Sequence, residues 1–281
     1  MAARADSVRS SVRYRTDDNR FFRYGSADAA RPSHARGRTP FALKGSATLT
    51  ATENRLLDAL PSGIVDDIMP ALHRERLRLR RTLYEPGERI RDLWFPIDAI
   101  ISIVTVMEDG THVEGFTVGR EGVCGAMAIL DGPVASQLTY CQVEGDAYRL
   151  PYAVFAQMIE KHEDLKGLIE RYISAQIDVM AQSIACNRLH YVSERCARWI
   201  LSTYDRVGRE EFPLTHEVLA IMLGVRRAGV SIAAAQLQQQ GAIRYARGRF
   251  MVADRDKLEQ ATCECYGAVN DAYAKRRLPP S

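Results

Sequence analysis

Apolar and polar positions near the C-terminus form two helical patterns followed by a strand pattern. In the first, apolar residues recur at helical spacing over residues 218–223, and Thr215 is a suitable N-cap. In the second, apolar residues line one face over residues 227–240, and a glycine follows. Apolar residues then alternate over residues 243–252. This alternation predicts two short strands joined at residues 247–249.

Two short helices joined by a glycine-containing turn are typical of a helix-turn-helix. In that motif the start of the second helix enters the major groove of DNA, where arginine can form two hydrogen bonds with guanine. Arginines on the following hairpin would meet phosphates. The alternative is a helical hairpin that only packs and whose arginines are solvated. The predicted DNA-contacting residues are Thr215, Arg226, Arg227, Ser231, Arg244, Arg247 and Arg249.

The residues before this motif change from a helical pattern to a strand pattern. Residues 53–76 have a helical apolar stripe that is broken at Pro61 and Pro70. From about residue 77 to residue 150, short apolar runs alternate with turn residues, and Glu108 to Thr111 read as a hairpin turn. Strands at this spacing predict a small antiparallel barrel or jelly roll.

Helices are predicted again from Pro151 onwards. The longest runs from about residue 163 to residue 187, and a second covers about residues 192–207. The near-heptad spacing of apolar residues in the long helix favours pairing with a second copy of the chain. The alternative is a helix that is buried within its own chain. The predicted dimer contacts are Leu165, Ile169, Tyr172, Ile173, Gln176, Ile177, Met180 and Ile184.

Composition and charge narrow the class of protein. The 281 residues are 46% hydrophobic and 26% charged, as in ordinary globular proteins, and no run is long enough to span a membrane. The net charge of +3 divides into about +6 for residues 1–50, −7 for 51–189 and +4 for 190–281. A basic C-terminal third suggests that this part faces a polyanion. The absence of a secretory signal pattern and of a disulfide-type cysteine framework favours the cytoplasm.

These patterns predict an α+β fold with four parts. Residues 1–50 are expected to be a disordered basic tail, because they are rich in arginine and lack apolar periodicity. Residues 51–160 are expected to form the antiparallel jelly-roll barrel, and residues 161–189 the dimerisation helix. Residues 190–281 are expected to form a winged helix-turn-helix domain with a C-terminal helix.

The order of barrel, long helix and winged helix-turn-helix resembles the CRP/FNR family of bacterial transcription regulators. The resemblance covers about residues 53–262 and is most specific in LGVRRAGVSIAAAQLQQQGAI. It implies a homodimer that binds double-stranded DNA, contacts RNA polymerase and has an effector pocket in a cyclic-nucleotide-binding-like barrel, with no membrane partner. Arg227 falls where the family commonly has a base-reading arginine. Ala228 and Ile232 fall where many members have glutamate and arginine, which implies a different operator.

The resemblance also identifies a loop for the effector, in VGREGVCGAMAILDGPVASQLTY. Its effector-pocket candidates are Gly119, Arg120, Glu121, Gly122 and Gly125. Cyclic-nucleotide-binding members carry an arginine shortly after this loop that pairs with the phosphate. That arginine is missing here, so the strongest partner of a cyclic phosphate is lost. Cyclic AMP and cyclic GMP are therefore not expected to be cofactors, and the effector is unidentified.

Neither catalysis nor a metal centre is predicted. His73 and His112 lack the clustered ligands of a catalytic metal site, and residues 1–123 contain no cysteine for an N-terminal iron–sulfur cluster. Cys263 and Cys265 supply two soft ligands, but no neighbouring pair completes a tetrahedron. They are expected to pack the final helix against the winged domain, and Cys186 is expected in a helix core. The remaining alternative is a small-molecule or redox-sensing protein whose winged domain binds protein.

Overall fold

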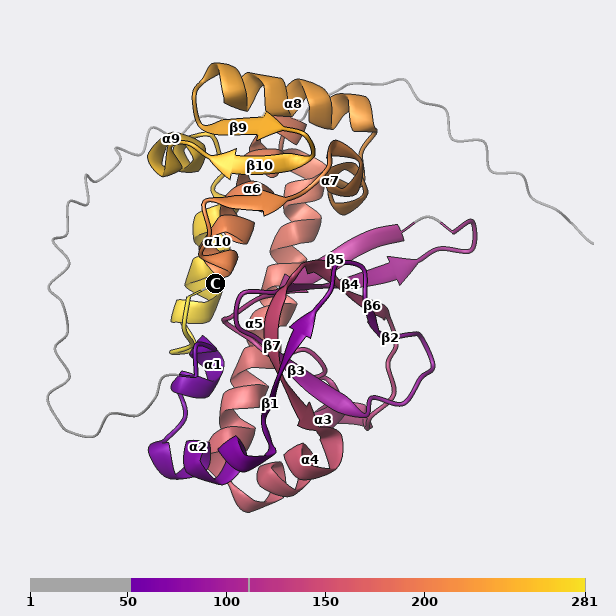
Figure 1. Ribbon diagram of the computed structural model, residues 1–281, viewed down its shortest axis with the longest axis vertical. Coiled ribbons are helices and arrows are strands. Elements are labelled where there is room, and N and C mark those ends of the chain that lie inside the picture. Colours follow the sequence, from indigo (N-terminus) through magenta and orange to yellow (C-terminus); the bar gives the residue numbers. More distant parts are fainter. Residues whose placement is uncertain (1–51, 111, 281) are drawn as a thin grey trace, which may run out of the picture. The chain divides into compact units, whose positions relative to one another are not determined.

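Short strands in the N-terminal half form two antiparallel sheets in the computed structural model, which describes residues 52–110 and 112–280. The predicted tail, residues 1–50, lies outside the described residues. The strands are His73–Leu77 (β1), Thr82–Tyr84 (β2), Asp92–Pro96 (β3), Ile100–Val106 (β4), His112–Val118 (β5), Leu138–Val143 (β6) and Gly145–Pro151 (β7). Their orders are β1-β7-β3 and β2-β6-β4-β5 (Figure 1). This arrangement confirms the predicted antiparallel β-barrel region.

The inner faces of these two sheets form an apolar core. Trp94, Ile101 and Val118 are buried there, together with Cys124 and Cys141. The predicted turn between β4 and β5 begins at Met107, whose carbonyl accepts a 2.9 Å hydrogen bond from the Gly110 N–H. Gly110 has a φ of 80°, a conformation that glycine adopts without strain.

The predicted helical region at residues 53–76 is shorter in the structure. It contains α1 (Arg55–Asp58), α2 (Ser62–Ile68) and a 3-10 turn, Met69–Ala71. The prediction is wrong from His73 onwards, because β1 begins there and pairs along its length with β7. Proline in the 3-10 turn ends the helical run, and the chain then becomes extended. A short helix at Ala128–Asp131 (α3) was not predicted.

Three helices follow the barrel: α4 (Tyr152–Lys161), α5 (Glu163–Leu189) and α6 (Val192–Val207). The α6 bounds confirm the prediction, and α5 ends two residues later than expected. One face of α5 packs into a core shared with α1, α2 and α4.

The last helix, α10 (Cys265–Ala274), lies along α5. Tyr273 is fully buried against α5, and its hydroxyl accepts a 2.9 Å hydrogen bond from Gln176 Nε2. Arg276 forms a 2.8 Å ion pair with Asp178. The expectation that the final helix packs against the winged domain is confirmed in part. Tyr266, near the start of α10, packs on the core of that domain, and its hydroxyl donates to Asp205 of α6. The later apolar residues of α10 join the core of α5 instead.

The C-terminal part before α10 contains the predicted winged motif. Its helices are α7 (His216–Leu223), α8 (Arg227–Gln239) and α9 (Arg255–Gln260), and its strands are Glu211–Pro213 (β8), Ile243–Ala246 (β9) and Arg249–Val252 (β10). The sheet order is β8-β10-β9, and α6 and α8 pack over it around a separate apolar core. Only α9 and β8 were not predicted.

Among the described residues, no single helix combines the length and apolar composition needed to cross a membrane. The α7 and α8 helices would pass such a test together, but the chain bends by 109° between them.

Candidate nucleic-acid interface and barrel cavity

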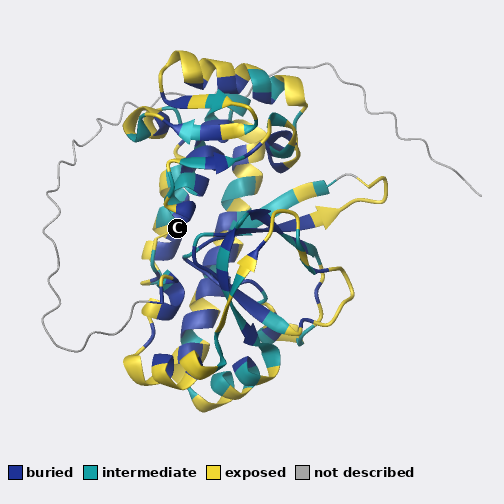
Figure 2. Cartoon of the chain, viewed as in Figure 1, coloured by how far each residue is buried: buried dark blue, intermediate teal, exposed yellow. Residues whose placement is uncertain are grey.

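The start of α8 presents an exposed, positively charged surface. Thr215 caps α7, since its Oγ1 accepts a 3.2 Å hydrogen bond from the Val218 N–H, and Gly224 ends α7 with a φ of 62°. The chain then enters α8 at Arg226 and Arg227, whose side chains are exposed and make no hydrogen bond or ion pair with a described residue. The outer face of α8 is exposed (Figure 2). Both arginines are thus available to an external partner.

The same face carries the residues at the two positions that depart from the family pattern. Ile232 is 62% exposed and Ala228 is also exposed. A large apolar side chain so exposed on a helix flanked by arginines is suited to contact with an apolar group such as a thymine methyl.

The arginines of the wing, which is the β9–β10 hairpin, differ in their partners. Arg247 and Gly248 form the tip with φ values of 50° and 76°, the pattern of a two-residue hairpin turn. Arg244 and Arg247 are exposed without a partner among the described residues. Arg249 instead forms an ion pair with Glu211 on the neighbouring strand β8. Phosphate contact by Arg249 would therefore compete with this pair, whereas Arg244 and Arg247 are available.

Ser231 and His216 join the two helices of the motif to the wing. The Ser231 hydroxyl donates to the Arg227 carbonyl at 3.1 Å and lies 3.0 Å from Nδ1 of His216. Because a hydroxyl has one proton, both bonds form together only when Nδ1 donates. The His216 ring also stacks on Tyr245 of the wing at 4.1 Å. Ser231, predicted to contact DNA, thus positions α8 within the chain.

Stability of the winged domain is expected to fall as pH falls below about 6.5. Burial and, next, the charge of Arg227 lower the pKa of His216 from its ordinary value of 6.5. At pH values between 6.5 and the lowered pKa, His216 is protonated in the unfolded chain but neutral in the folded chain. Acid therefore favours unfolding. The thermal midpoint of His216→Gln should fall less than that of the unmodified protein between about pH 7.5 and about pH 5.5. Equal falls in the two proteins would contradict this role.

The predicted dimer contacts on α5 divide into two groups. Leu165, Ile169, Tyr172, Ile173 and Gln176 are buried within the chain itself, so the expectation that they contact a second copy is corrected. Ile177 is 54% and Ile184 is 73% exposed, and Met180 is half-buried. The physical reason is that α10 and the barrel cover the first group, which leaves the second group on the outer side.

The glycine-rich loop after β5 packs against α5 and α6. A Cβ atom at Gly119 would lie 2.8 Å from the Arg206 side chain, and one at Gly122 would lie 2.2 Å from the Tyr172 hydroxyl oxygen. Arg120 donates to the Val207 carbonyl at 3.1 Å. The glycines at these positions therefore allow close packing of helices on the loop.

A cavity of about 80 Å³ lies between the barrel and α5. Of the five predicted effector-pocket residues, Gly125 lines this cavity, whereas Gly119, Arg120, Glu121 and Gly122 do not. Its polar lining is neutral, with Ser136 and Thr139 among its members, and includes no arginine or lysine. Pockets for organic ligands usually hold about 300–1,000 Å³. In this conformation the cavity is smaller than such pockets, and its lining residues include no cationic side chain.

Buried polar side chains connect the barrel to α6. Arg206 Nε lies 3.0 Å from Glu121 Oε1, with 7% and 0% of the two side chains exposed, and Arg206 Nη1 donates to Thr117 Oγ1 at 2.6 Å. Glu114 accepts hydrogen bonds from Trp199 Nε1 at 3.0 Å and from Ser102 at 2.8 Å. Burial raises the pKa of Glu114, and these hydrogen bonds oppose the rise. Sequence patterns gave no sign of this network, because its partners are far apart in the chain.

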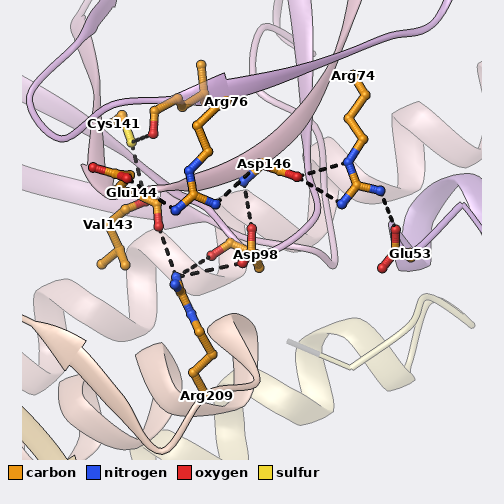
Figure 3. A network of polar contacts seen from close by, with 10 residues as sticks. Glu53, Arg74, Arg76, Asp98, Cys141, Val143, Glu144, Asp146 and Arg209 are labelled. Carbon is orange, nitrogen blue, oxygen red and sulfur yellow. Dashed lines mark hydrogen bonds and ion pairs between the residues drawn. The ribbon is translucent and has the colours of Figure 1, made fainter.

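Arg209 belongs to a second network of polar contacts, which is more exposed (Figure 3). Arg209, in the segment after α6, donates to the Glu144 carbonyl at 2.9 Å and lies 3.8 Å from the Asp98 carboxylate. The Asp98 carboxylate also accepts a 2.6 Å hydrogen bond from the Asp146 N–H. The barrel side of this contact is thereby held in place by its own hydrogen bonds.

Four potential metal ligands lie together at the end of α5. Cys186 and His190 come from that end, Cys263 comes from the segment between α9 and α10, and Cys265 is the first residue of α10. All four ligand atoms lie within 4.8 Å of one another. The expectation that no pair completes a site around Cys263 and Cys265 is therefore corrected, and Cys186 belongs to this cluster as well as to the helix.

Comparison with known families and structures agrees with this geometry. Residues 194–261 match the Crp-like helix-turn-helix domain. The structure is similar to that of FixK2 from Bradyrhizobium japonicum, with 13% identity, a TM-score of 0.58, and coverage of 68% of this chain and 98% of FixK2. No match was found among curated proteins.

Two further solved structures share the fold. The c-di-GMP-responsive global regulator CLP of Xanthomonas campestris is 14% identical, with a TM-score of 0.56 and coverage of 69% of this chain and 100% of CLP. A CRP-family transcriptional regulator of Thermus thermophilus is 23% identical, with a TM-score of 0.54 and coverage of 66% of this chain and 95% of that regulator.

The fold and the exposed arginine surface define a class of protein, a barrel joined to a winged helix-turn-helix. Residues 194–261 belong to the Crp-like helix-turn-helix domain family, and the chain shares its fold with FixK2 and CLP.

Proposed function

We propose that this protein is a homodimeric transcription regulator that reads a near-palindromic operator through the start of α8 and does not respond to cyclic AMP. The proposal rests on the exposure of Arg226 and Arg227 at the start of α8, the recognition helix. Their side chains have no partner among the described residues. Arginine at that position can pair with both acceptors of a guanine edge. The same proposal includes RNA polymerase as a further partner.

The outer side of α5 supports dimerisation through that helix. Ile177 and Ile184 of α5 are seven residues apart, and they are 54% and 73% exposed. Apolar residues at heptad spacing on a long helix are suited to packing against a second copy of the same helix. Two recognition helices would then lie about 34 Å apart, in successive major grooves.

The packing of the barrel favours an effector other than a cyclic nucleotide, or no effector at all. Arg206 and Tyr172 fill the space beside the glycine-rich loop, and the remaining cavity lacks a cation. An effector that opened this packing would change how α6 rests on the barrel, and so the placement of α8. The proposal assigns no catalytic role to the chain.

Selection of bound sequences from a random DNA pool, with and without cell extract, tests the proposal. The expected result is enrichment of a two-fold symmetric site, with half-sites about one helical turn apart. Failure to bind any duplex, combined with capture of a protein by the winged domain, would instead favour an interaction protein.

Arg247 is expected to add affinity without sequence preference. Arg247→Asn removes the charge at the wing tip, and asparagine tolerates the left-handed φ of 50° at that position. Binding to all duplexes should weaken alike, and the slope of log K against log salt should fall by about one unit per wing. Arg89→Asn, on the barrel, is the matched control and should leave the slope unchanged. A change of sequence preference in Arg247→Asn would contradict the assignment to phosphate contact.

A further inference from the structure

The cluster of Cys186, His190, Cys263 and Cys265 joins segments far apart in the sequence. Cys186 lies in the last turn of α5, and His190 is the residue that caps this helix. Cys263 lies 77 residues after Cys186, and Cys265 lies 75 residues after His190, with Glu264 between the two cysteines at the start of α10. The three cysteines are buried and are free thiols.

The spacing of the ligand atoms matches a single four-coordinate metal ion. Cys186 Sγ lies 3.6 Å from Cys263 Sγ, and Cys265 Sγ lies 3.5 Å from His190 Nδ1. A zinc–sulfur bond of about 2.3 Å implies edges of about 3.8 Å between sulfurs in a tetrahedron. An iron–sulfur cluster places several atoms between its ligands and would need them farther apart. A disulfide would need its sulfurs at about 2.05 Å.

Polar and charged side chains surround the four ligands. His190 Nε2 lies 3.1 Å from the Glu264 carboxylate, which leaves Nδ1 facing the thiols. A carboxylate on the far nitrogen is the usual partner of a metal-bound histidine, because it fixes the ring and its tautomer. Gln182 Nε2 donates to Cys265 Sγ at 3.0 Å. The positive charges of Arg195 and Arg198 act on Cys186 and would offset the net negative charge of three thiolates around a divalent ion.

We infer that these four residues bind one zinc ion, in a closed structural site that fastens the segment after the wing to the end of α5. Three thiolates and one imidazole form a ligand set typical of structural zinc, and all four coordination positions are supplied by the chain. His190 immediately precedes the junction with α6, which begins at Val192. The ion would therefore hold the joint between the long helix and the winged domain, and the final helix α10 beside it.

Elemental analysis of the full-length protein, purified under reducing conditions without chelators, tests this inference directly. About one zinc per chain is expected. Replacement by cobalt(II) should give the ligand-field bands of a tetrahedral ion and a thiolate charge-transfer band. A chain without bound metal after incubation with zinc, or one with iron and acid-labile sulfide in its place, would overturn the inference.

Variants identify the ligands. Cys263→Ser combined with Cys265→Ser should lose the zinc, whereas the matched control, Cys124→Ala combined with Cys196→Ala, should keep it. Glu264→Gln should keep the four ligands but weaken zinc affinity by about 10- to 100-fold, since it removes only the partner of His190. Retention of zinc by the Cys263 and Cys265 variant would overturn the assignment. Should that variant fail to fold, the cobalt spectrum of the unmodified protein still decides. None of these measurements depends on DNA, so they stand apart from any failure of the proposed function.

Discussion

Replacement of Arg206 by alanine is expected to destabilise the protein by about 3–5 kcal/mol. Arg206 is the cation that faces the fully buried carboxylate of Glu121, at 3.0 Å. Burial alone would lower the pKa of Arg206, but Glu121 and other neighbours raise it overall. Without the guanidinium, Glu121 would remain in the interior with only the Gly119 N–H as a donor among the described residues. Urea unfolding of the purified variant measures the loss.

Two further variants separate the lost ion pair from lost packing. Arg209→Ala, at the same face of the barrel, removes a pair whose side chains are 38% and 27% exposed, and it should cost less than about 1 kcal/mol. Arg206→Met combined with Glu121→Gln removes both charges and should recover much of the stability lost in Arg206→Ala. If Arg206→Ala is no less stable than Arg209→Ala, then the buried pair of Arg206 and Glu121 does not hold α6 on the barrel.

Local sequence patterns were sufficient to predict α6, α7 and α8, although not α9. The predicted bounds of α6 and α7 were confirmed, and α8 differs by one residue at its end. These helices are defined by near neighbours: the Thr215 cap, the glycine at 224 and the apolar residues at helical spacing. The exposure of Arg226 and Arg227 follows from the same pattern, because the inner face is apolar and the arginines fall outside it.

Long-range contacts explain what the sequence did not predict. Glycines at 119 and 122 resemble a phosphate-binding loop, but here they leave room for Arg206 and Tyr172 from two later helices. The apolar stripe of α5 predicted dimer contacts, yet part of it is covered by α10, a helix whose own pattern gives no sign of this contact. Cys186 was expected in a helix core and His190 had no predicted role, and only the fold brings them to Cys263 and Cys265.

Arg227→Ala is expected to remove most of the sequence selectivity of DNA binding. An arginine that pairs with a guanine edge contributes about 1–3 kcal/mol per half-site, or roughly 5- to 160-fold in affinity. The affinity for the selected operator should fall by that factor at each half-site, while affinity for random duplex falls far less. Competition binding with the two DNAs at fixed salt measures the ratio. Folding should be little affected, because the side chain is exposed and alanine is a good helix former.

Arg227→Lys distinguishes base reading from simple attraction to phosphate. Lysine keeps the charge but lacks the planar pair of donors, so non-specific binding should persist while the preference for the operator declines. Gln236→Ala, an exposed substitution farther along the same helix, is the control and should change neither quantity. An operator-to-random ratio that is unchanged in Arg227→Ala would mean that the start of α8 does not read bases. In that event Ile232, which is 62% exposed one turn later, would be the next residue on α8 to test.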